Sequence, residues 1–219
     1  MDFKEFKNSK GGVTGLCVVV DCVAGKDDEV LAGLVENFST NRSENVLPVS
    51  VGYIKNKGDY LIPMLVKDVA DADDVIIDKI RSVPGVCDVK SYLFNLQGAD
   101  EATPPPATES MDDQPFLAHG ILFIDVESGK DRDVLRKVAA STDGTVAINF
   151  LAHCFHSFDC AMIAFVSSYS HNILFEWIRE NVRSIDGVLD TDLDIISSME
   201  PLLLPDEVQT LMTELAKLE

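Results

Sequence analysis

Apolar runs and amphipathic stretches follow one another along this chain in an order that occurs twice. Leu16–Leu31 reads LCVVVDCVAGKDDEVL and Ile121–Leu135 reads ILFIDVESGKDRDVL, so each copy is an apolar run, a Gly-Lys-Asp turn and the start of an amphipathic helix. A repeat of this length indicates a duplicated domain rather than the short period of a solenoid. We therefore expect two copies of one small module.

In the first copy, hydrophobic periodicity predicts the order strand, helix, strand, strand, helix, strand. The expected strands cover 13–24, 47–54, 60–69 and 86–96, and the helices begin near Asp27 and Asp71. Pro63 falls inside the third strand. Because proline cannot donate to a strand ladder, we expect a bulge at that position.

The second copy repeats the order, with strands over 119–126, 146–155, 160–167 and 192–199 and helices over 130–141 and 173–182. This βαββαβ order is that of the ferredoxin-like split unit, which makes the expected class α+β, with two tandem modules.

Between the copies lies 98–115, an acidic segment with three consecutive prolines and almost no apolar residues, which predicts a semi-stiff linker. The expected domains are therefore 13–97 and 116–219, the second with a C-terminal helix over 206–218.

The charge balance excludes several partners. The formal net charge is −19, whereas nucleic acids and anionic membrane surfaces attract basic faces.

No apolar run reaches the roughly 18 residues of a membrane span, and the N-terminus lacks the apolar core of a signal peptide. The five cysteines are odd in number and form no Cys-x-x-Cys pair, so we expect reduced thiols in a cytoplasmic protein.

Residues 53–96 carry a set of turn and packing signals that resembles the effector-binding domain of the Lrp/AsnC regulators. The turn aspartate of that family corresponds to Asp59, its Pro-Gly-Val to 84–86, and its final-strand threonine to Ser91; in the second copy the turn pattern is Phe158-Asp159. The family's turn glycine would fall at Asn56 and His156, and Gly58 is offered instead. The helix-turn-helix of the regulators is absent, since only about a dozen polar residues precede the first strand.

The resemblance implies modules of the dimeric α+β barrel type that pair through their sheets as homo-oligomers and bind amino acids or related metabolites at subunit contacts. On this basis the ligand-binding candidates are Gly58, Asp59, Ser91, Phe158 and Asp159. Backbone N–H groups of the turn would take the ligand's carboxylate and the aspartate its ammonium group. No cofactor is expected.

Other residues allow a second interpretation beside a plain structural one. His153 and His156, with Cys154 and Cys160 nearby, are of types that suit zinc or haem iron. Because neighbouring positions of a strand alternate between faces, the two histidines point apart, and we expect a strand end and turn without metal.

Several isolated aspartates, lysines and histidines also allow both a functional and a structural interpretation. Asp21 and Asp125 either line a pocket or are solvated strand ends, and Lys26 and Lys130 either hold an anion or belong to the turns. His119 and His171 are isolated in the sequence, and each is expected to be a surface or capping residue.

The function expected from these observations is non-enzymatic binding or sensing of an amino-acid-like small molecule, without DNA binding. Two alternatives stay open. Dimeric α+β barrels also host monooxygenases and haem or tetrapyrrole enzymes, so an enzyme of that type is one of them. A structural adaptor with an acidic surface is the other.

Overall fold

The computed structural model describes residues 14–40, 45–55, 57, 59–67, 69–95, 118–142, 144–155 and 160–203. The expected linker over 98–115 and the expected helix over 206–218 lie outside the described residues. The chain divides into two compact units: unit 1 is Met1–Leu96 with Ser198–Glu219, and unit 2 is Gln97–Ser197.

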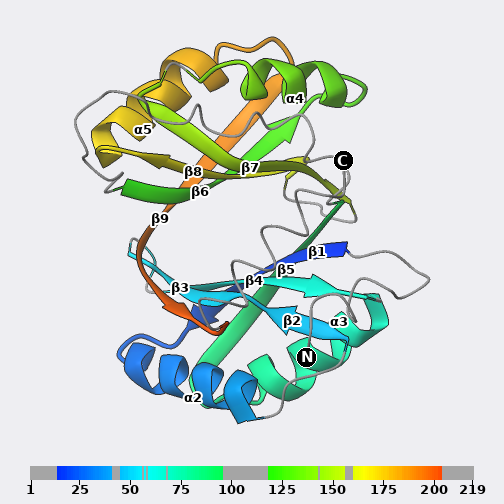
Figure 1. Cartoon of the computed structure of the whole chain (residues 1–219), viewed down its shortest axis with the longest axis vertical. Coiled ribbons are helices and arrows are strands. Elements are labelled where there is room, and N and C mark those ends of the chain that lie inside the picture. Colours follow the sequence, from blue (N-terminus) through cyan, green and yellow to red (C-terminus); the bar gives the residue numbers. More distant parts are fainter. Residues whose placement is uncertain are drawn as a thin grey trace. The chain divides into compact units, whose positions relative to one another are not determined.

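Unit 1 is an antiparallel sheet with helices against one face (Figure 1). Its elements are β1 (Thr14–Cys22), α2 (Asp27–Thr40), β2 (Val46–Pro48), β3 (Ser50–Ile54), β4 (Asp59–Val66), α3 (Val69–Val75), the π-helical turn η1 (Ile76–Arg81) and β5 (Val86–Asn95). β1 lies between β5 and β4, while β2 and β3 follow one another along the other edge of β4.

Pro63 is accommodated differently from the expected bulge. It stays in register with β1, opposite Cys17. On its other side the register moves by one residue between Leu47↔Leu65 and Gly52↔Leu61, and at this break the Val49 amide donates to the Pro63 carbonyl at 2.9 Å. The irregularity therefore lies in the facing chain, between β2 and β3, where a missing N–H leaves no partner unsatisfied.

Unit 2 has a second antiparallel sheet, again with helices on one face (Figure 1). Its elements are β6 (Ala118–Val126), α4 (Asp131–Ala139), β7 (Val146–Phe155), β8 (Met162–Ser168), α5 (His171–Trp177), η3 (Ile178–Val182) and β9 (Val188–Pro201), whose last residues belong to unit 1. The strand order is β7–β8–β6–β9.

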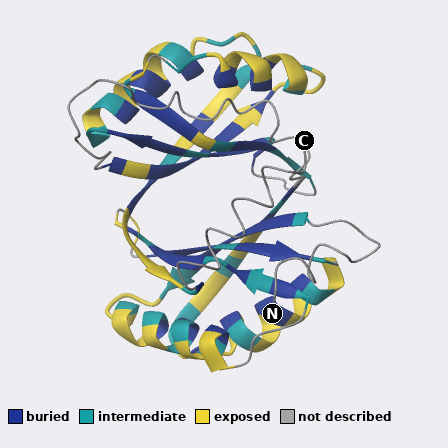
Figure 2. Ribbon diagram, in the orientation of Figure 1, coloured by how far each residue is buried: buried dark blue, intermediate teal, exposed yellow. Residues whose placement is uncertain are grey.

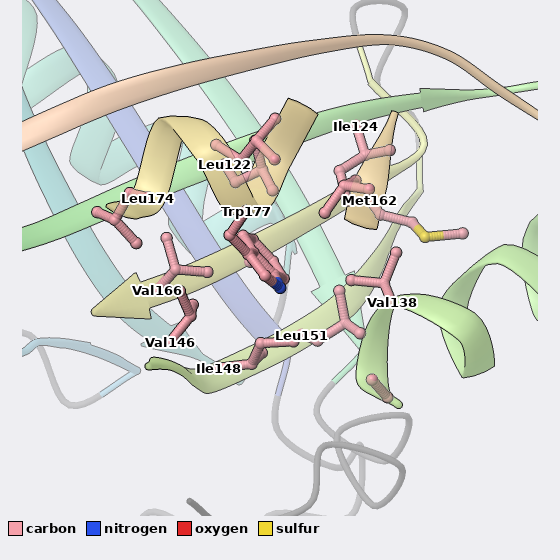
Figure 3. Close-up of a cluster of buried hydrophobic side chains, with 14 of the residues drawn as sticks. Leu122, Ile124, Val138, Val146, Ile148, Leu151, Met162, Val166, Leu174 and Trp177 are labelled. Atoms are coloured by element: carbon pink, nitrogen blue, oxygen red, sulfur yellow. The ribbon is translucent and has the colours of Figure 1, made fainter. Parts of the chain in front are cut away.

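Alternate residues of the unit 2 strands pack against the helices and form its core (Figure 3). Leu122, Val166 and Trp177 belong to this cluster, and the Trp177 indole donates to the Ser141 carbonyl at 3.0 Å. We call this side of each sheet the helix face and the other side the far face. Figure 2 shows that the helices are exposed on their outer sides and buried toward the sheet, as the period of 3.6 residues predicts.

The two units share several backbone details. In both, the first strand ends in an irregularity of register, after Asp21 in β1 and after Asp125 in β6. The first amide after each of these strands donates to the carbonyl of a glycine with positive φ. Val23 donates to Gly85 and Glu127 to Gly187, both at 2.8 Å. A second helix that ends in a π-helical turn also occurs in both.

Among the described residues, no helix combines the length and apolar character needed to cross a membrane.

Candidate functional site

A row of polar side chains crosses the far face of the unit 2 sheet. His119 on β6 stands opposite Ser167 on β8 and Ile196 on β9. Cross-strand partners project to the same face, with Cβ atoms about 4.5–5.5 Å apart. Asn149 on β7 extends the row, because its Nδ2 donates to the Ser167 Oγ at 2.9 Å.

Asn149 reaches this row because β7 is bulged there. The pairing with β8 passes from Ile148↔Val166 to Phe150↔Phe165, so Asn149 is the extra residue. A bulge re-aims a side chain that regular pairing would place elsewhere. Here it brings an amide next to Ser167, which is only 2% exposed.

Apolar side chains surround the row on the same face. Ile121 and Ile163 are fully buried, and Phe123 is 8% exposed. The Phe150 and Phe165 rings pack edge to face with centroids 6.0 Å apart. This part of the face is therefore apolar and largely shielded from solvent.

The β9 edge of the far face is acidic. Asp190, Asp192 and Asp194 alternate along β9, opposite Asp125, Phe123 and Ile121 of β6. Asp194 is buried, with 2% exposure. None of the described residues that pair into this far face is a lysine or arginine. The local field therefore favours a neutral or cationic molecule over an anion.

The corresponding place in unit 1 is apolar. Gly15 of β1 pairs with Leu65 and with Phe94. The Phe94 ring occupies the position that a Cβ on Gly15 would need. Because unit 1 builds the same strand pairing without polar side chains, the fold itself does not require the His119, Ser167 and Asn149 row.

The ligand-binding residues expected from the sequence are only partly placed. Gly58, Phe158 and Asp159 lie outside the described residues. Asp59 is 8% exposed, and its Oδ1 accepts from the backbone N–H of Cys22 at 3.3 Å. Ser91 pairs with Val18, a residue of the helix-face core, whereas Asp59 alternates with Tyr60 of that core. The structure therefore does not bring Asp59 and Ser91 onto one face.

Tyr60 and Cys22 lie where β4 and β1 meet the start of α2. The Tyr60 hydroxyl donates to the Asp27 carbonyl at 2.7 Å. Burial, followed by the charge of Asp59, raises the pKa of Cys22 to about 12. Burial likewise raises the pKa of Tyr60 to about 12. Cys22 therefore stays a neutral thiol near pH 7 and is not set up as a nucleophile.

The lysines of the two Gly-Lys-Asp turns have carboxylate partners. Lys26 contacts Glu29 at 2.7 Å, and Lys130 contacts Glu127 at 2.9 Å and Asp186 at 3.0 Å. These ion pairs favour the turn interpretation of both lysines over a role in holding an anion.

The two candidate metal-binding histidines are not brought together by the described structure. His153 pairs with Met162, and His156 lies outside the described residues. In the part of the chain that the structure describes, no three His, Cys, Asp or Glu side chains are placed to hold a metal ion.

Comparison with known proteins rests on solved structures. No family model and no curated protein matches the chain. A chlorite dismutase from Candidatus Nitrospira defluvii, in complex with imidazole, is 11% identical, with 99% of each chain covered and a TM-score of 0.56. A putative monooxygenase from Fusobacterium nucleatum subsp. nucleatum is 10% identical over 88% of this chain and 96% of that one, with a TM-score of 0.55. A putative monooxygenase from Lactobacillus acidophilus NCFM is 10% identical over 87% and 97%, with a TM-score of 0.53.

These neighbours correct the function expected from the sequence. The non-enzymatic amino-acid sensor rested on turn and packing signals, which any chain with this backbone needs whatever it binds. The structures that share the fold along nearly the whole chain are named as enzymes, so the expectation of a sensor is wrong and the enzyme alternative is better supported. These neighbours do not single out the effector-binding domain of the Lrp/AsnC regulators. The chain shares its α+β fold with these chlorite dismutase and putative monooxygenase structures.

Proposed function

We propose that this chain is an enzyme of the dimeric α+β barrel type, a monooxygenase-like oxidoreductase acting on a small, largely apolar molecule that is neutral or cationic. The substrate would lie on the far face of unit 2. The observation that carries this proposal is the row formed by His119, Ser167 and Asn149. The apolar side chains of Ile121, Ile163 and Phe123 lie on the same face.

Each member of the row has a chemical role. Imidazole is the side chain best suited to exchange protons near neutral pH, and His119 is exposed beside Ser167. The Ser167 hydroxyl accepts from Asn149 and keeps its own hydrogen to donate. We therefore assign proton transfer from the substrate to the exposed His119, while Ser167, which is only 2% exposed, holds the Asn149 amide beside it.

Charge favours the monooxygenase alternative over a haem enzyme. Haem carries two carboxylates, and sites that hold such groups supply arginine or lysine. Among the described residues that pair into the far face of unit 2 there is neither, and Asp125, Asp190, Asp192 and Asp194 line its edge. This face therefore fits haem poorly, although His119 has the right residue type for an axial ligand.

Oxygen uptake tests the proposal directly. The purified chain is given a panel of hydroquinones, phenols and aromatic amines in an oxygen-electrode cell, and turnover of at least one is expected. His119→Ala should lower kcat by about 100-fold or more, the usual contribution of a positioned base. His171→Ala at the start of α5 is the matched control and should keep full activity. Equal activity of the two variants would contradict the assignment.

Titration with haemin separates the two kinds of enzyme. We expect no stoichiometric Soret band. A one-to-one band that His119→Ala abolishes would replace the monooxygenase by a haem enzyme at the same face.

We further infer that the two units are ferredoxin-like βαββαβ modules that arose by tandem duplication, and that the chain forms homo-oligomers through sheet packing. The strand orders and the shared glycine contacts support the first inference. The fold type supports the second, and light scattering of the purified protein tests it.

A further inference from the structure

Two cysteines of unit 2 lie in direct contact. The Cys160 Sγ donates to the Cys154 Sγ at 3.8 Å, and the two residues are six positions apart in the chain. Cys154 is near the end of β7, and Cys160 lies just before β8. Neither belongs to the row formed by His119, Ser167 and Asn149.

The backbone on both sides of this pair is held by hydrogen bonds. The Cys154 amide donates to the Ala161 carbonyl at 2.9 Å, and the Ala161 amide donates to the Ile124 carbonyl on β6 at 2.9 Å. A disulfide requires the sulfurs to approach to about 2.05 Å. Since the two sulfurs are already in contact at 3.8 Å, only a short further approach is required.

The other cysteines differ in their surroundings. Cys17 is buried in β1, and Cys22 is a thiol whose pKa lies near 12. Cys87 is exposed, with its Sγ against the Asp21 carbonyl at 3.3 Å. These three belong to unit 1, so the pair in unit 2 combines a neighbouring sulfur with partial access to solvent.

We propose that Cys154 and Cys160 form a reversible, peroxide-sensitive disulfide, a modification site separate from the proposed catalytic row. Cys154 is the more accessible of the two, since it is half-buried while Cys160 is 5% exposed. Hydrogen peroxide therefore oxidises Cys154 first: its sulfur takes one peroxide oxygen to become a sulfenic acid, and one water leaves. The Cys160 sulfur then attacks the Cys154 sulfur, the S–S bond forms, and the sulfenic oxygen leaves as a second water. Two electrons pass from the two thiols to the peroxide, and dithiothreitol returns them.

Peptide mapping of the full chain identifies the bond. Protein treated with a few equivalents of hydrogen peroxide is alkylated with iodoacetamide and digested with chymotrypsin, which cuts after Phe155 and Phe158 and so leaves the two cysteines on separate peptides. We expect one linked peptide pair, lighter by two hydrogen atoms than its parts, that disappears with dithiothreitol. Linkage through Cys87, or sulfinic acid on Cys154 without linkage, would overturn the proposal.

Variants and stability supply a second readout. Cys154→Ser and Cys160→Ser should each abolish the linked pair, whereas Cys87→Ser keeps it. In wild type, oxidation should raise Tm by about 5 °C, because closing even a short loop restricts the unfolded chain. The same rise in Cys160→Ser would show that the stabilisation does not come from this bond and would overturn the proposal. Neither assay depends on a substrate, so failure of the monooxygenase proposal would leave this result standing.

Discussion

At the scale of single residues, the Cys22 thiol and the Tyr60 hydroxyl of unit 1 keep their protons to a higher pH in the folded chain than in the unfolded chain. Burial is the main cause of the raised pKa of both groups, followed by the charge of Asp59 for Cys22 and by the charge of Cys22 for Tyr60. Their ordinary pKa values are 9.0 and 10.0, and in the folded chain both lie near 12. Between these limits the folded state binds more protons than the unfolded state, so folding becomes less favourable as the pH rises.

The pH dependence of stability follows from this difference. The contribution of these two groups to the free energy of unfolding should be at its full value below pH 9 and fall as the pH rises toward 12. Cys22→Ser should remove the part of the fall that begins near pH 9, and Tyr60→Phe the part that begins near pH 10. Tyr60→Phe should also cost about 1 kcal/mol at neutral pH, because the bond to the Asp27 carbonyl is lost. Urea unfolding at a series of pH values from neutral to strongly alkaline measures all three, and an unchanged slope in both variants would contradict the expectation.

At the scale of elements, each unit joins its first strand to its first helix in the same way. Gly85 and Gly187 have φ of +98° and +100° and lie against the side chains at the start of the helix. A Cβ on Gly187 would stand 2.6 Å from the Lys130 Cδ and 3.2 Å from the Val134 Cγ2. Gly129 also has positive φ, +89°, but no atom lies within 4 Å of the position that a Cβ would take there.

Gly129 and Gly187 allow the cost of a strained backbone to be measured separately from the cost of a steric clash. Gly129→Ala should cost about 1 kcal/mol from its left-handed backbone alone. Gly187→Ala should cost about 3 kcal/mol, because the methyl group also displaces Lys130 and Val134. Trp177 fluorescence during urea unfolding reports on the unit 2 core, since this is the single tryptophan of the chain. Equal losses for the two variants would mean that the packing against α4 contributes nothing.

Sequence periodicity locates most of these elements but not the contacts between them. The run over 13–24 and the helix starting at Asp27 correspond to β1 and α2. The π-helical turns η1 and η3 escape prediction, since they keep the same apolar spacing as an α-helix. His119 is isolated in the sequence because its neighbours Ser167 and Asn149 are distant along the chain and meet it only through strand register. The contact between the two unit 2 cysteines likewise depends on the bend at Ala161.

At the scale of the whole molecule, unit 1 is built from two separate parts of the chain, one before and one after unit 2. β9 begins in unit 2, but the residues from Ser198 onward belong to unit 1. The Leu202 amide donates to the Val49 carbonyl at 3.0 Å, and its side chain packs on the unit 1 core. Unit 1 is therefore completed by a part of the chain that is synthesised after all of unit 2.

Leu202 tests this completion. Leu202→Ala should destabilise unit 1 by about 1–2 kcal/mol, less than a fully buried leucine because the side chain is half-buried. Met199→Ala, at a position 48% exposed on the same segment, is the control and should change stability by less than about 0.5 kcal/mol. Amide hydrogen exchange read by mass spectrometry assigns the loss to a unit: exchange should accelerate in β2 to β4 and stay unchanged in β6 to β8. Faster exchange confined to unit 2 would show that the segment after Ser197 supports the unit it leaves rather than the unit it enters.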